Sequence, residues 1–399
     1  MGRDLRNTPE NTLLAIAAGT VERVEPPCPH FGSCGGCQLQ HLPYAGQITA
    51  KHAMLLDVLR LAGVFKVPEV QLHSAHPWTY RNRIRLRTEG GDIGYSRQES
   101  NSFLPVDVCP IASPLLERMA LHMRDAVRMR RAAWPSGAAS FELFTDAGER
   151  AVQLAIHLRD TLGSVDREAP THFRAFCEHV QRNMPELVGA GLLAAAPDAQ
   201  QSRRVQSTQR VEIARWGSPR LTYEVGDVAY TVTRNAFFQV NRYLTADMVT
   251  AVVGHRTGRL AFDLYAGAGL FSVPLSQRFS EVVAVEIGEP AATDLAQHLA
   301  VSGTPNRAVR STTQAFLERE ARRPDLVVMD PPRAGVSLPA LHALCRLQPE
   351  EIVYVSCDAG TFARDARTLL ESGYTLAALH LFDLFPQTVH TETIAVFRL

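Results

Sequence analysis

The stretch Asp263-Leu-Tyr-Ala-Gly267-Ala-Gly269-Leu-Phe271 decides the fold of this chain. It continues the apolar run Leu260–Leu264, and a Gly-x-Gly turn at the end of a strand lets the backbone approach a ligand closely. The next apolar run ends at Glu286, 23 residues after Asp263, where an acidic side chain can accept hydrogen bonds from ribose hydroxyls. Glycines also occur in other tight turns, but the two features together predict a nucleoside-containing cofactor. The incomplete Gly-x-Gly-x-x-Gly points away from a dinucleotide.

Short apolar runs recur along this half of the chain, and helical stretches separate them. The runs are Leu260–Leu264, Val282–Glu286, Leu326–Met329 and Ile352–Val355. Apolar strands that alternate with helices are typical of a parallel sheet built from strand–helix–strand units. We therefore predict a doubly wound, Rossmann-like α/β domain over residues 231–399.

Upstream of this domain the pattern changes to strands with a few helices. Apolar residues at helical spacing predict a helix between Gln47 and Gly63, in a segment 46–75 that we expect to pack on the α/β domain. We interpret residues 76–230 as a central mixed, strand-rich α+β domain. Residues 1–45 hold a group of cysteines, and the Pro26–Pro27 pair before it indicates an extended lead-in.

The composition is that of a globular protein without a charge bias. The 399 residues are 46% hydrophobic and 21% charged, and 41 basic side chains balance 41 acidic ones. The net charge gives no support for nucleic-acid binding, although a local basic surface is compatible with it. No uncharged apolar run reaches the roughly 18 residues of a membrane-spanning helix, and acidic residues near the N-terminus argue against a cleaved signal. We expect a cytoplasmic protein.

Three of the seven cysteines lie together as Cys28-x5-Cys34-x2-Cys37, in a loop rich in glycine. Cys109, which precedes a proline, is available as a fourth ligand. An odd number of cysteines with such a group fits a metal site and a reactive thiol better than a disulfide scaffold. Four thiolates suit either zinc or an iron–sulfur cluster, and their spacing does not choose between them.

Three further motifs lie where strands of the α/β domain end or begin. Asp330-Pro-Pro-Arg follows one apolar run, so we expect Asp330 at the sheet edge, facing the cofactor crevice. Cys357 follows the next run, and its place at a strand end among polar residues favours a reactive thiol over a core residue. Glu392 stands between two threonines before the last strand, where a solvated edge residue and a functional carboxylate are both compatible with the sequence.

Arginines occupy every second position from residue 81 to residue 87. In a strand, side chains at this spacing face the same way, about 6–7 Å apart. Such a row suits the phosphates of a nucleic acid, and a solvated strand face is the alternative. The residues are Arg81, Arg83, Arg85 and Arg87.

These ordered motifs make the chain resemble the RNA 5-methyluridine methyltransferase family, and in particular its iron–sulfur subgroup, which modifies uridines of large-subunit ribosomal RNA. The likeness runs from about Pro26 to Leu399. The matching elements, in chain order, are Cys-x5-Cys-x2-Cys with a distant Cys-Pro, Phe-Phe-Gln-Val-Asn, Asp-Leu-Tyr-x-Gly-x-Gly-Leu-Phe, Asp-Pro-Pro-Arg, Ser-Cys-x-x-x-Thr-x-Ala-Arg-Asp and Phe-Pro-x-Thr-x-His-x-Glu.

The resemblance implies S-adenosylmethionine-dependent methylation of uridine C5 in 23S ribosomal RNA, with Cys357 as nucleophile and Glu392 as general base. It implies that RNA is the partner, bound in part by the arginine row, with no membrane and no obligate protein partner. It implies a [4Fe-4S] cluster on Cys28, Cys34, Cys37 and Cys109. It also implies contacts to S-adenosylmethionine from residues spread over the α/β domain, namely Gln239, Tyr265, Gly267, Gly269, Leu270, Glu286, Thr312 and Asp330.

The chain departs from the family pattern in three places. Many relatives carry an extra N-terminal RNA-binding barrel, of which we expect at most the last strand before Cys28. Ala266 stands where a cysteine is common, and Asp358-Ala-Gly replaces the usual Asn-Pro-Ala after the nucleophile. None of these changes removes a catalytic group, but the missing barrel leaves the RNA substrate open.

Three alternative functions remain at this point. One is a transfer-RNA enzyme with the same mechanism, which only RNA substrates separate from a ribosomal one. Another is an RNA-binding iron–sulfur module with an inactive catalytic half, against which the presence of Cys357 and Glu392 argues. The third is a DNA cytosine methyltransferase, whose usual Pro-Cys motif differs from Ser356-Cys357.

Overall fold

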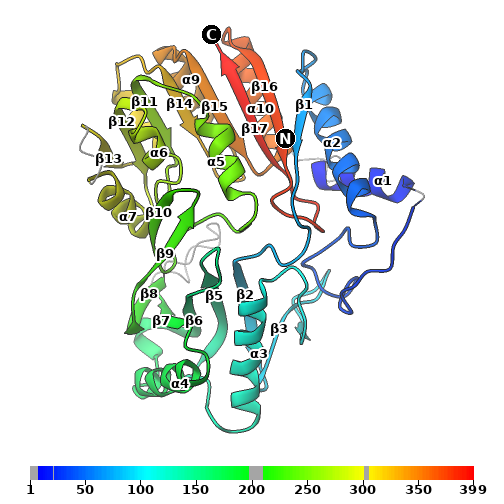
Figure 1. Cartoon of the computed structure of the whole chain (residues 1–399), viewed down its shortest axis with the longest axis vertical. Helices are drawn as coiled ribbons and strands as arrows, with labels where there is room; N and C mark the ends of the chain where they lie inside the picture. Colours follow the sequence, from blue (N-terminus) through cyan, green and yellow to red (C-terminus); the bar gives the residue numbers. More distant parts are fainter. Residues whose placement is uncertain (1–7, 21, 197–209, 301–304) are drawn as a thin grey trace.

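The computed structural model describes residues 8–20, 22–196, 210–300 and 305–399. Its strands form an eight-stranded sheet, a seven-stranded sheet and a two-stranded hairpin. Figure 1 shows the two large sheets in separate parts of the molecule, with the hairpin β9 (Arg220–Val225) and β10 (Val228–Thr233) between them. The first sheet belongs to the α/β part and the second to the central part.

The eight-stranded sheet confirms the predicted doubly wound architecture. Its order is β1-β16-β17-β15-β14-β11-β12-β13, and neighbouring strands run parallel except at β17, which is antiparallel to both β15 and β16. Each of the four predicted apolar runs forms a strand of this sheet. The strands are β1 (Val70–His73), β11 (Gly258–Leu264), β12 (Phe279–Glu286), β13 (Arg307–Arg310), β14 (Leu326–Met329), β15 (Glu351–Ser356), β16 (Thr375–Phe382) and β17 (Glu392–Arg398).

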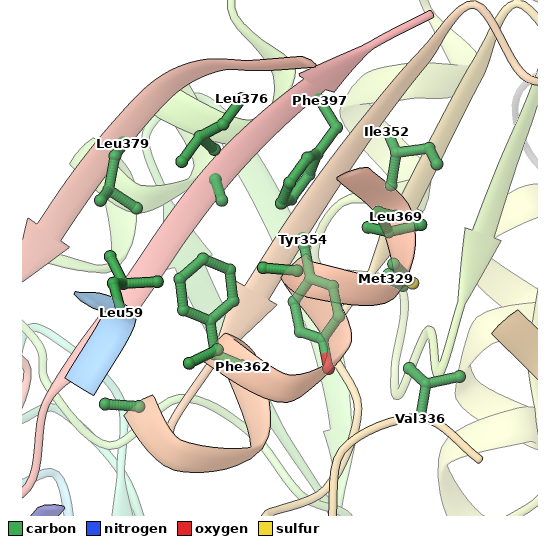
Figure 2. Close-up of a cluster of buried hydrophobic side chains, with 14 of the residues drawn as sticks. Leu59, Met329, Val336, Ile352, Tyr354, Phe362, Leu369, Leu376, Leu379 and Phe397 are labelled. Atoms are coloured by element: carbon green, nitrogen blue, oxygen red, sulfur yellow. The ribbon is translucent and has the colours of Figure 1, made fainter. Parts of the chain in front are cut away.

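One face of this sheet carries the largest hydrophobic core. Leu59 of helix α2, Phe362 of α10 and Leu344 of α9 pack against sheet residues such as Tyr354 and Phe397, and all five are buried. Figure 2 shows the rings of Tyr354, Phe362 and Phe397 gathered with aliphatic side chains from the neighbouring strands. The helices on this face are α2 (Tyr44–Leu61), α8 (Thr313–Arg319), α9 (Leu338–Leu347) and α10 (Ala359–Glu371).

The opposite face packs on a second core. Helices α5 (Thr245–Val253) and α6 (Ser272–Ser276) cover it together with the β9–β10 hairpin, whose Tyr223 and Tyr230 are buried there. Helix α7 (Glu289–Ala300) packs along the edge that ends in β13. The hairpin begins inside the segment that the sequence groups with the central domain, but its apolar residues pack on the α/β part.

The central part is a sheet in the order β4-β3-β2-β5-β6-β7-β8, covered on one face by α3 (Pro114–Arg128) and α4 (Ala169–Asn183). Alternation along the strands puts residues such as Ile84 and Leu86 against these helices. The strands are β2 (Arg83–Glu89), β3 (Asp92–Ser96), β4 (Phe103–Pro105), β5 (Ala138–Thr145), β6 (Val152–Thr161), β7 (Leu187–Ala195) and β8 (Arg210–Gly217), and the short 3₁₀ turn Leu162–Ser164 follows β6.

The segment before Cys28 differs from the expected extended lead-in. It contains helix α1 (Pro9–Gly19) and no strand among the described residues, so the last strand of the barrel is not seen there. Thr8 caps the helix, because its side chain accepts a hydrogen bond from the Asn11 amide. Leu13 and Ala17 lie one turn apart and are buried in the core that also contains α2. Within the described ranges, no helix is long and apolar enough to cross a membrane.

Candidate active site

Cys357 and Glu392 come from neighbouring strands of the large sheet. Cys357 directly follows β15, and Glu392 is the first residue of β17. These strands are antiparallel and pair Ser356 with Thr393, so each site residue lies one position beyond this cross-strand pair. Cys357 is partly buried and Glu392 is 3% exposed. The fold therefore brings together a thiol and a buried carboxyl that are 35 residues apart in the sequence.

Burial and the neighbouring acidic groups disfavour the ionised forms of both Cys357 and Glu392. Burial raises the pKa of Cys357 to about 12, and the nearby carboxyl groups of Glu392 and Asp330 add to the shift. Burial also raises the pKa of Glu392 well above its usual range, and Asp330 contributes in the same direction. The pKa of Asp330 is itself raised to about 7 by burial. The three acidic groups thus share one poorly solvated site, in which a cation would stabilise the thiolate.

Arg333 is the cation that the structure provides here. Its charge lowers the pKa of both Cys357 and Glu392, although burial outweighs it in each case. An Nη atom of Arg333 donates a 2.9 Å hydrogen bond to Nδ1 of His390, whose pKa burial and nearby cations lower to about 4. His390 is therefore neutral at pH 7 and can accept this bond. No role was expected from the sequence for either residue, although Arg333 belongs to the Asp-Pro-Pro-Arg motif and His390 lies two residues before Glu392.

The Gly-x-Gly turn after β11 folds over the acidic residue at the end of β12. Gly267 has φ +55° and Gly269 has φ +95°, and a side chain at Gly269 would meet Leu295 at 2.9 Å. The amides of Gly267 and Gly288 donate to the two carboxylate oxygens of Glu286, at 2.9 and 2.6 Å. The turn and Glu286 therefore form one hydrogen-bonded unit at the carboxyl end of the sheet, where ligands of this fold class bind.

A cavity of about 290 Å³ opens beside this unit. Tyr265, Glu286 and Thr312 line it, and Thr312 also caps helix α8 by accepting a hydrogen bond from the Ala315 amide. Three of the expected cofactor residues therefore share one cavity. Its lining is Tyr265, Val285, Glu286, Ile287, Ser311, Thr312, Thr313, Gln314, Gly335 and Ser337.

The other five expected cofactor residues are not among those that line this cavity, and two of them, Gly267 and Gly269, form the turn beside it. Leu270 is 8% exposed and belongs to the core under the β9–β10 hairpin, where its carbonyl accepts a hydrogen bond from Tyr230. Gln239 is 5% exposed, and its carbonyl accepts from Asn82. Asp330 belongs to the group of acids around Cys357.

The four cysteines that the sequence singled out line one cavity of about 270 Å³. Cys28, Cys34 and Cys37 come from the loop before α2, and Cys109 comes from the segment between β4 and α3. All four thiols are free, and the Tyr95 hydroxyl donates to the Cys109 sulfur at 3.8 Å. No group of three or more histidine, cysteine or acidic side chains in the described ranges is arranged to hold a single metal ion.

The arginine row is shorter than its spacing suggests. Arg81 precedes β2, lines the cysteine cavity and lies beside the ring of Tyr80. Arg83 pairs with Glu142 at 3.1 Å and stacks on a phenylalanine, so its charge is already engaged. Arg85 is exposed, and the side chain of Arg87 is 38% exposed. Arg87 also lies 3.7 Å from Glu89 and donates to a backbone carbonyl at 2.6 Å. Arg85 thus presents its charge to solvent, and Arg87 does so in part.

Lys51 of α2 is a buried residue to which the sequence analysis gave no role. Its ammonium group donates to Asp383 at 2.6 Å and to the Phe385 carbonyl at 3.1 Å, and both charged side chains are fully buried. The chain has two lysines, Lys51 and Lys66, among 41 basic residues. The rarity of lysine in a chain this rich in arginine is the sequence signal that could have pointed to Lys51, whose ammonium group fits the buried site beside Asp383.

Comparison with known proteins shows the family to which the chain is similar. The family model described as tRNA (Uracil-5-)-methyltransferase matches residues 218–398. A 23S rRNA (uracil(1939)-C(5))-methyltransferase RlmD from Shewanella sp. (strain MR-4) is 31% identical over 414 residues, which cover 99% of this chain and 86% of that protein. An uncharacterized RNA methyltransferase from Chlorobaculum tepidum is 28% identical and covers 98% and 86% of the two chains.

Among solved structures, the Pyrococcus abyssi tRNA (uracil-54, C5)-methyltransferase in complex with S-adenosyl-L-homocysteine has a similar fold. Its TM-score is 0.72 at 23% sequence identity, with 92% of this chain and 86% of that chain covered. At this level of identity the likeness concerns the fold.

The mixed α/β fold and the matching relatives together define an S-adenosylmethionine-dependent methyltransferase. The chain belongs to the RNA uracil-5-methyltransferase family. It is an enzyme that methylates C5 of uracil in RNA.

Proposed function

We propose that this enzyme methylates a uridine of 23S ribosomal RNA, through a transient covalent bond between the Cys357 sulfur and C6 of the base. The observation that carries the mechanism is the position of Cys357 and Glu392 beside the Ser356–Thr393 pair. The choice of ribosomal RNA is supported by the relative that is 31% identical and is named a 23S rRNA (uracil(1939)-C(5))-methyltransferase. We propose that the enzyme works in the cytoplasm on this RNA.

The chemistry follows from the electronic structure of uracil. C5 is a poor nucleophile, but addition of the Cys357 thiolate at C6 makes an enolate whose C5 is electron-rich. Bound S-adenosylmethionine would supply its sulfonium methyl group to C5, with the S–CH3 bond broken and S-adenosylhomocysteine as the leaving group. Glu392 removes the C5 proton, the C5–C6 double bond re-forms and the Cys357 thiolate leaves. The base must reach both the thiol and the methyl donor, so we propose that the uridine is flipped out of its stack.

We assign the binding of S-adenosylmethionine to the cavity that Tyr265, Glu286 and Thr312 line. The amides of Gly267 and Gly288 fix the Glu286 carboxylate, whose remaining lone pairs are suited to ribose hydroxyls. Asp330, which follows β14, and Gln239, which lies between β10 and α5, complete the proposed binding site. For Gly269 and Leu270 we propose an indirect role, in which they shape the turn.

We further propose that Cys28, Cys34, Cys37 and Cys109 hold a [4Fe-4S] cluster. A single zinc ion would need four sulfurs about 2.3 Å from one point, whereas these thiols are spread around a cavity of about 270 Å³. The donors match the four thiolates that bind such clusters. The methyl transfer needs no redox step, so these residues would serve to fix the loop. Metal analysis of anaerobically purified protein should find about four iron and four sulfide per chain, and zinc would overturn this assignment.

We propose that the central part, residues 76–230, binds RNA through the exposed charge of Arg85 and Arg87. Arg85 also lines the cysteine cavity, which places this surface beside the loop from Cys28 to Cys37. Contacts to phosphates would give affinity without reading the sequence.

The test is to map 5-methyluridine in total RNA from a strain that lacks the protein and from the same strain complemented with it. Loss of one site in 23S rRNA, restored by the wild-type chain and not by Cys357→Ala, is the expected result. Loss of a site in transfer RNA instead would favour the alternative substrate, which the name of the matching family model supports.

A further inference from the structure

The loop between β16 and β17, residues 383–391, ends at Glu392 and is bound to two distant parts of the chain. Gln387 lies in its middle, is 2% exposed and has φ +70°, a left-handed conformation that is uncommon for a residue with a side chain. Such a conformation persists only where the surroundings hold it. The contacts of Gln387 therefore show what fixes the second half of this loop.

Helix α2 supplies one set of these contacts. The Gln47 amide nitrogen donates to the Gln387 side-chain oxygen at 2.9 Å, and the Gln387 backbone amide donates to the Gln47 side-chain oxygen at 3.0 Å. Gln47 is 1% exposed. The Gln47 nitrogen also donates to the Leu39 and Leu42 carbonyls, both at 3.1 Å. Loss of the Gln47 side chain would therefore leave several buried polar groups without a partner.

The segment that follows Cys37 supplies the other set. The backbone amides of Gln38 and Leu39 both donate to the Gln387 carbonyl, at 2.9 and 3.0 Å. The Gln38 side chain donates to the Gly35 carbonyl at 2.8 Å and accepts from the Val389 amide at 3.4 Å. Gln38 therefore connects the turn that carries Cys34 and Cys37 to the residues just before Glu392.

We propose that Gln387 is a positioning residue for Glu392, through which helix α2 and the cysteine loop fix the carboxylate that removes the C5 proton. The inference rests on the proposed role of Glu392. A shift of about 1 Å in a catalytic group can cost about a hundredfold in rate. A change in the conformation of the cysteine loop, which is distant from Glu392 in the sequence, would thus alter the rate of one chemical step, the removal of the C5 proton.

The first half of the loop has anchors of its own. Asn241 donates to the Leu384 carbonyl at 3.0 Å, Lys51 to the Phe385 carbonyl at 3.1 Å and Tyr80 to the Pro386 carbonyl at 3.1 Å. A change at Gln387 leaves these three bonds in place. Its effect should therefore be confined to the stretch from residue 387 to Glu392, and Cys357 on β15 should keep its position.

The experiment compares Gln387→Gly and Gln47→Leu with the wild type. Glycine accepts the left-handed backbone and keeps the carbonyl that Gln38 and Leu39 bind, but it removes the buried side-chain pair. Gln47→Leu removes the same pair from the other side, together with the acceptor of the Gln387 amide and the bonds to the Leu39 and Leu42 carbonyls. Gln181→Leu, at an exposed position of α4, is the matched control. Gln387→Asn, which tolerates the left-handed conformation, tests rescue.

Two rates are measured in single turnovers with RNA, namely formation of the covalent adduct and its resolution to product. We expect Gln387→Gly and Gln47→Leu to form the adduct within about threefold of the wild-type rate and to resolve it about tenfold more slowly or worse. A primary isotope effect with RNA that carries deuterium at uridine C5 should appear or increase in these variants. Gln181→Leu should match the wild type, and Gln387→Asn should recover part of the rate.

A second arm connects the effect to the cysteine loop. Gln38→Ala removes the side-chain bonds to Gly35 and Val389 and should slow resolution in the same selective way, with unchanged iron content. Equal loss of both rates, or an unchanged isotope effect in folded Gln387→Gly protein, would overturn the proposal. If the wild type itself forms no adduct, the proposed mechanism fails instead. Thermal unfolding of each variant separates these outcomes from a failure to fold.

Discussion

Cys357 and Glu392 lie side by side because β17 runs against its neighbours. The strand is antiparallel to β15, so its first residue reaches the edge at which β15 ends, and Ser356 pairs with Thr393. In a parallel strand, Glu392 would start at the opposite edge of the sheet, a strand length away from the thiol. The reversal of one strand therefore brings the proposed nucleophile next to the proposed base.

Substitution of Cys357 and substitution of Glu392 should block the reaction at different steps. Cys357→Ala should abolish methyl transfer and should form no adduct with RNA that contains 5-fluorouridine, because no other thiol reaches C6. Glu392→Gln should still form the adduct and should accumulate it, because the C5 proton is not removed. Denaturing gels of protein with labelled RNA measure both effects. Full activity of Cys357→Ala would contradict the covalent mechanism. Absence of the adduct in Glu392→Gln would show that Glu392 is not the base that removes the C5 proton.

The Cys357 thiol should be unreactive in the free enzyme at neutral pH. A pKa of about 12, raised mainly by burial, keeps the group protonated, so the thiolate fraction and the alkylation rate rise with pH through the alkaline range. At pH 8 iodoacetamide should label Cys357 more than about a hundredfold more slowly than a free thiol of pKa about 8.5. Peptide mass spectrometry follows the labelling.

The positive sulfonium of S-adenosylmethionine should lower the pKa of this thiol, because a nearby cation favours the thiolate. S-adenosylhomocysteine has no such charge and is the matched control. Faster labelling with S-adenosylmethionine than with S-adenosylhomocysteine is the expected result. A labelling rate that already levels off below pH 8 in the free enzyme would contradict the raised pKa.

The contributions of Lys51 and Asp383 to the free energy of unfolding should depend on each other, because each buried charge needs its partner. Lys51→Met leaves the Asp383 carboxylate buried without its partner, so it should lower the free energy of unfolding by about 3–5 kcal/mol. Adding Asp383→Leu should recover most of this loss, because no isolated charge remains. Urea unfolding measures all three proteins. Additive losses in the double variant would show that the two side chains act independently.

The exposed arginines of β2 should contribute to RNA affinity in proportion to the phosphates they neutralise. Arg85→Ala and Arg87→Ala should each weaken RNA binding and reduce the slope of log affinity against log salt by about 1. Arg182→Ala is the control, because this exposed arginine belongs to α4 on the covered face of the sheet. Filter binding over a range of salt concentrations measures the slopes. If Arg85→Ala and Arg87→Ala have the same slope as the Arg182→Ala control, this surface does not contact the RNA.

The sequence by itself determined the α/β half of the protein. Apolar runs separated by helical stretches predicted the ends of β11, β12, β14 and β15 to within one residue and their starts to within three, because buried parallel strands are apolar on both faces. It also placed the proposed site residues at strand ends, since Cys357, Glu286 and the Gly-x-Gly turn each follow or end a strand. Helix α1 was missed because its signals, a capping threonine and two apolar residues one turn apart, are weak without the core that they enter.

Tertiary structure alone decided how these residues meet. The sequence did not show that β17 is reversed and inserted between β15 and β16, which is what sets Glu392 against Cys357. It placed four arginines in a row, but only folding showed that Arg81 is drawn into the cysteine cavity and Arg83 is paired with Glu142. It also gave no sign that Gln38, Gln47 and Gln387 are bonded. Local spacing encodes strands and turns, whereas contacts between residues hundreds of positions apart depend on how the buried faces pack.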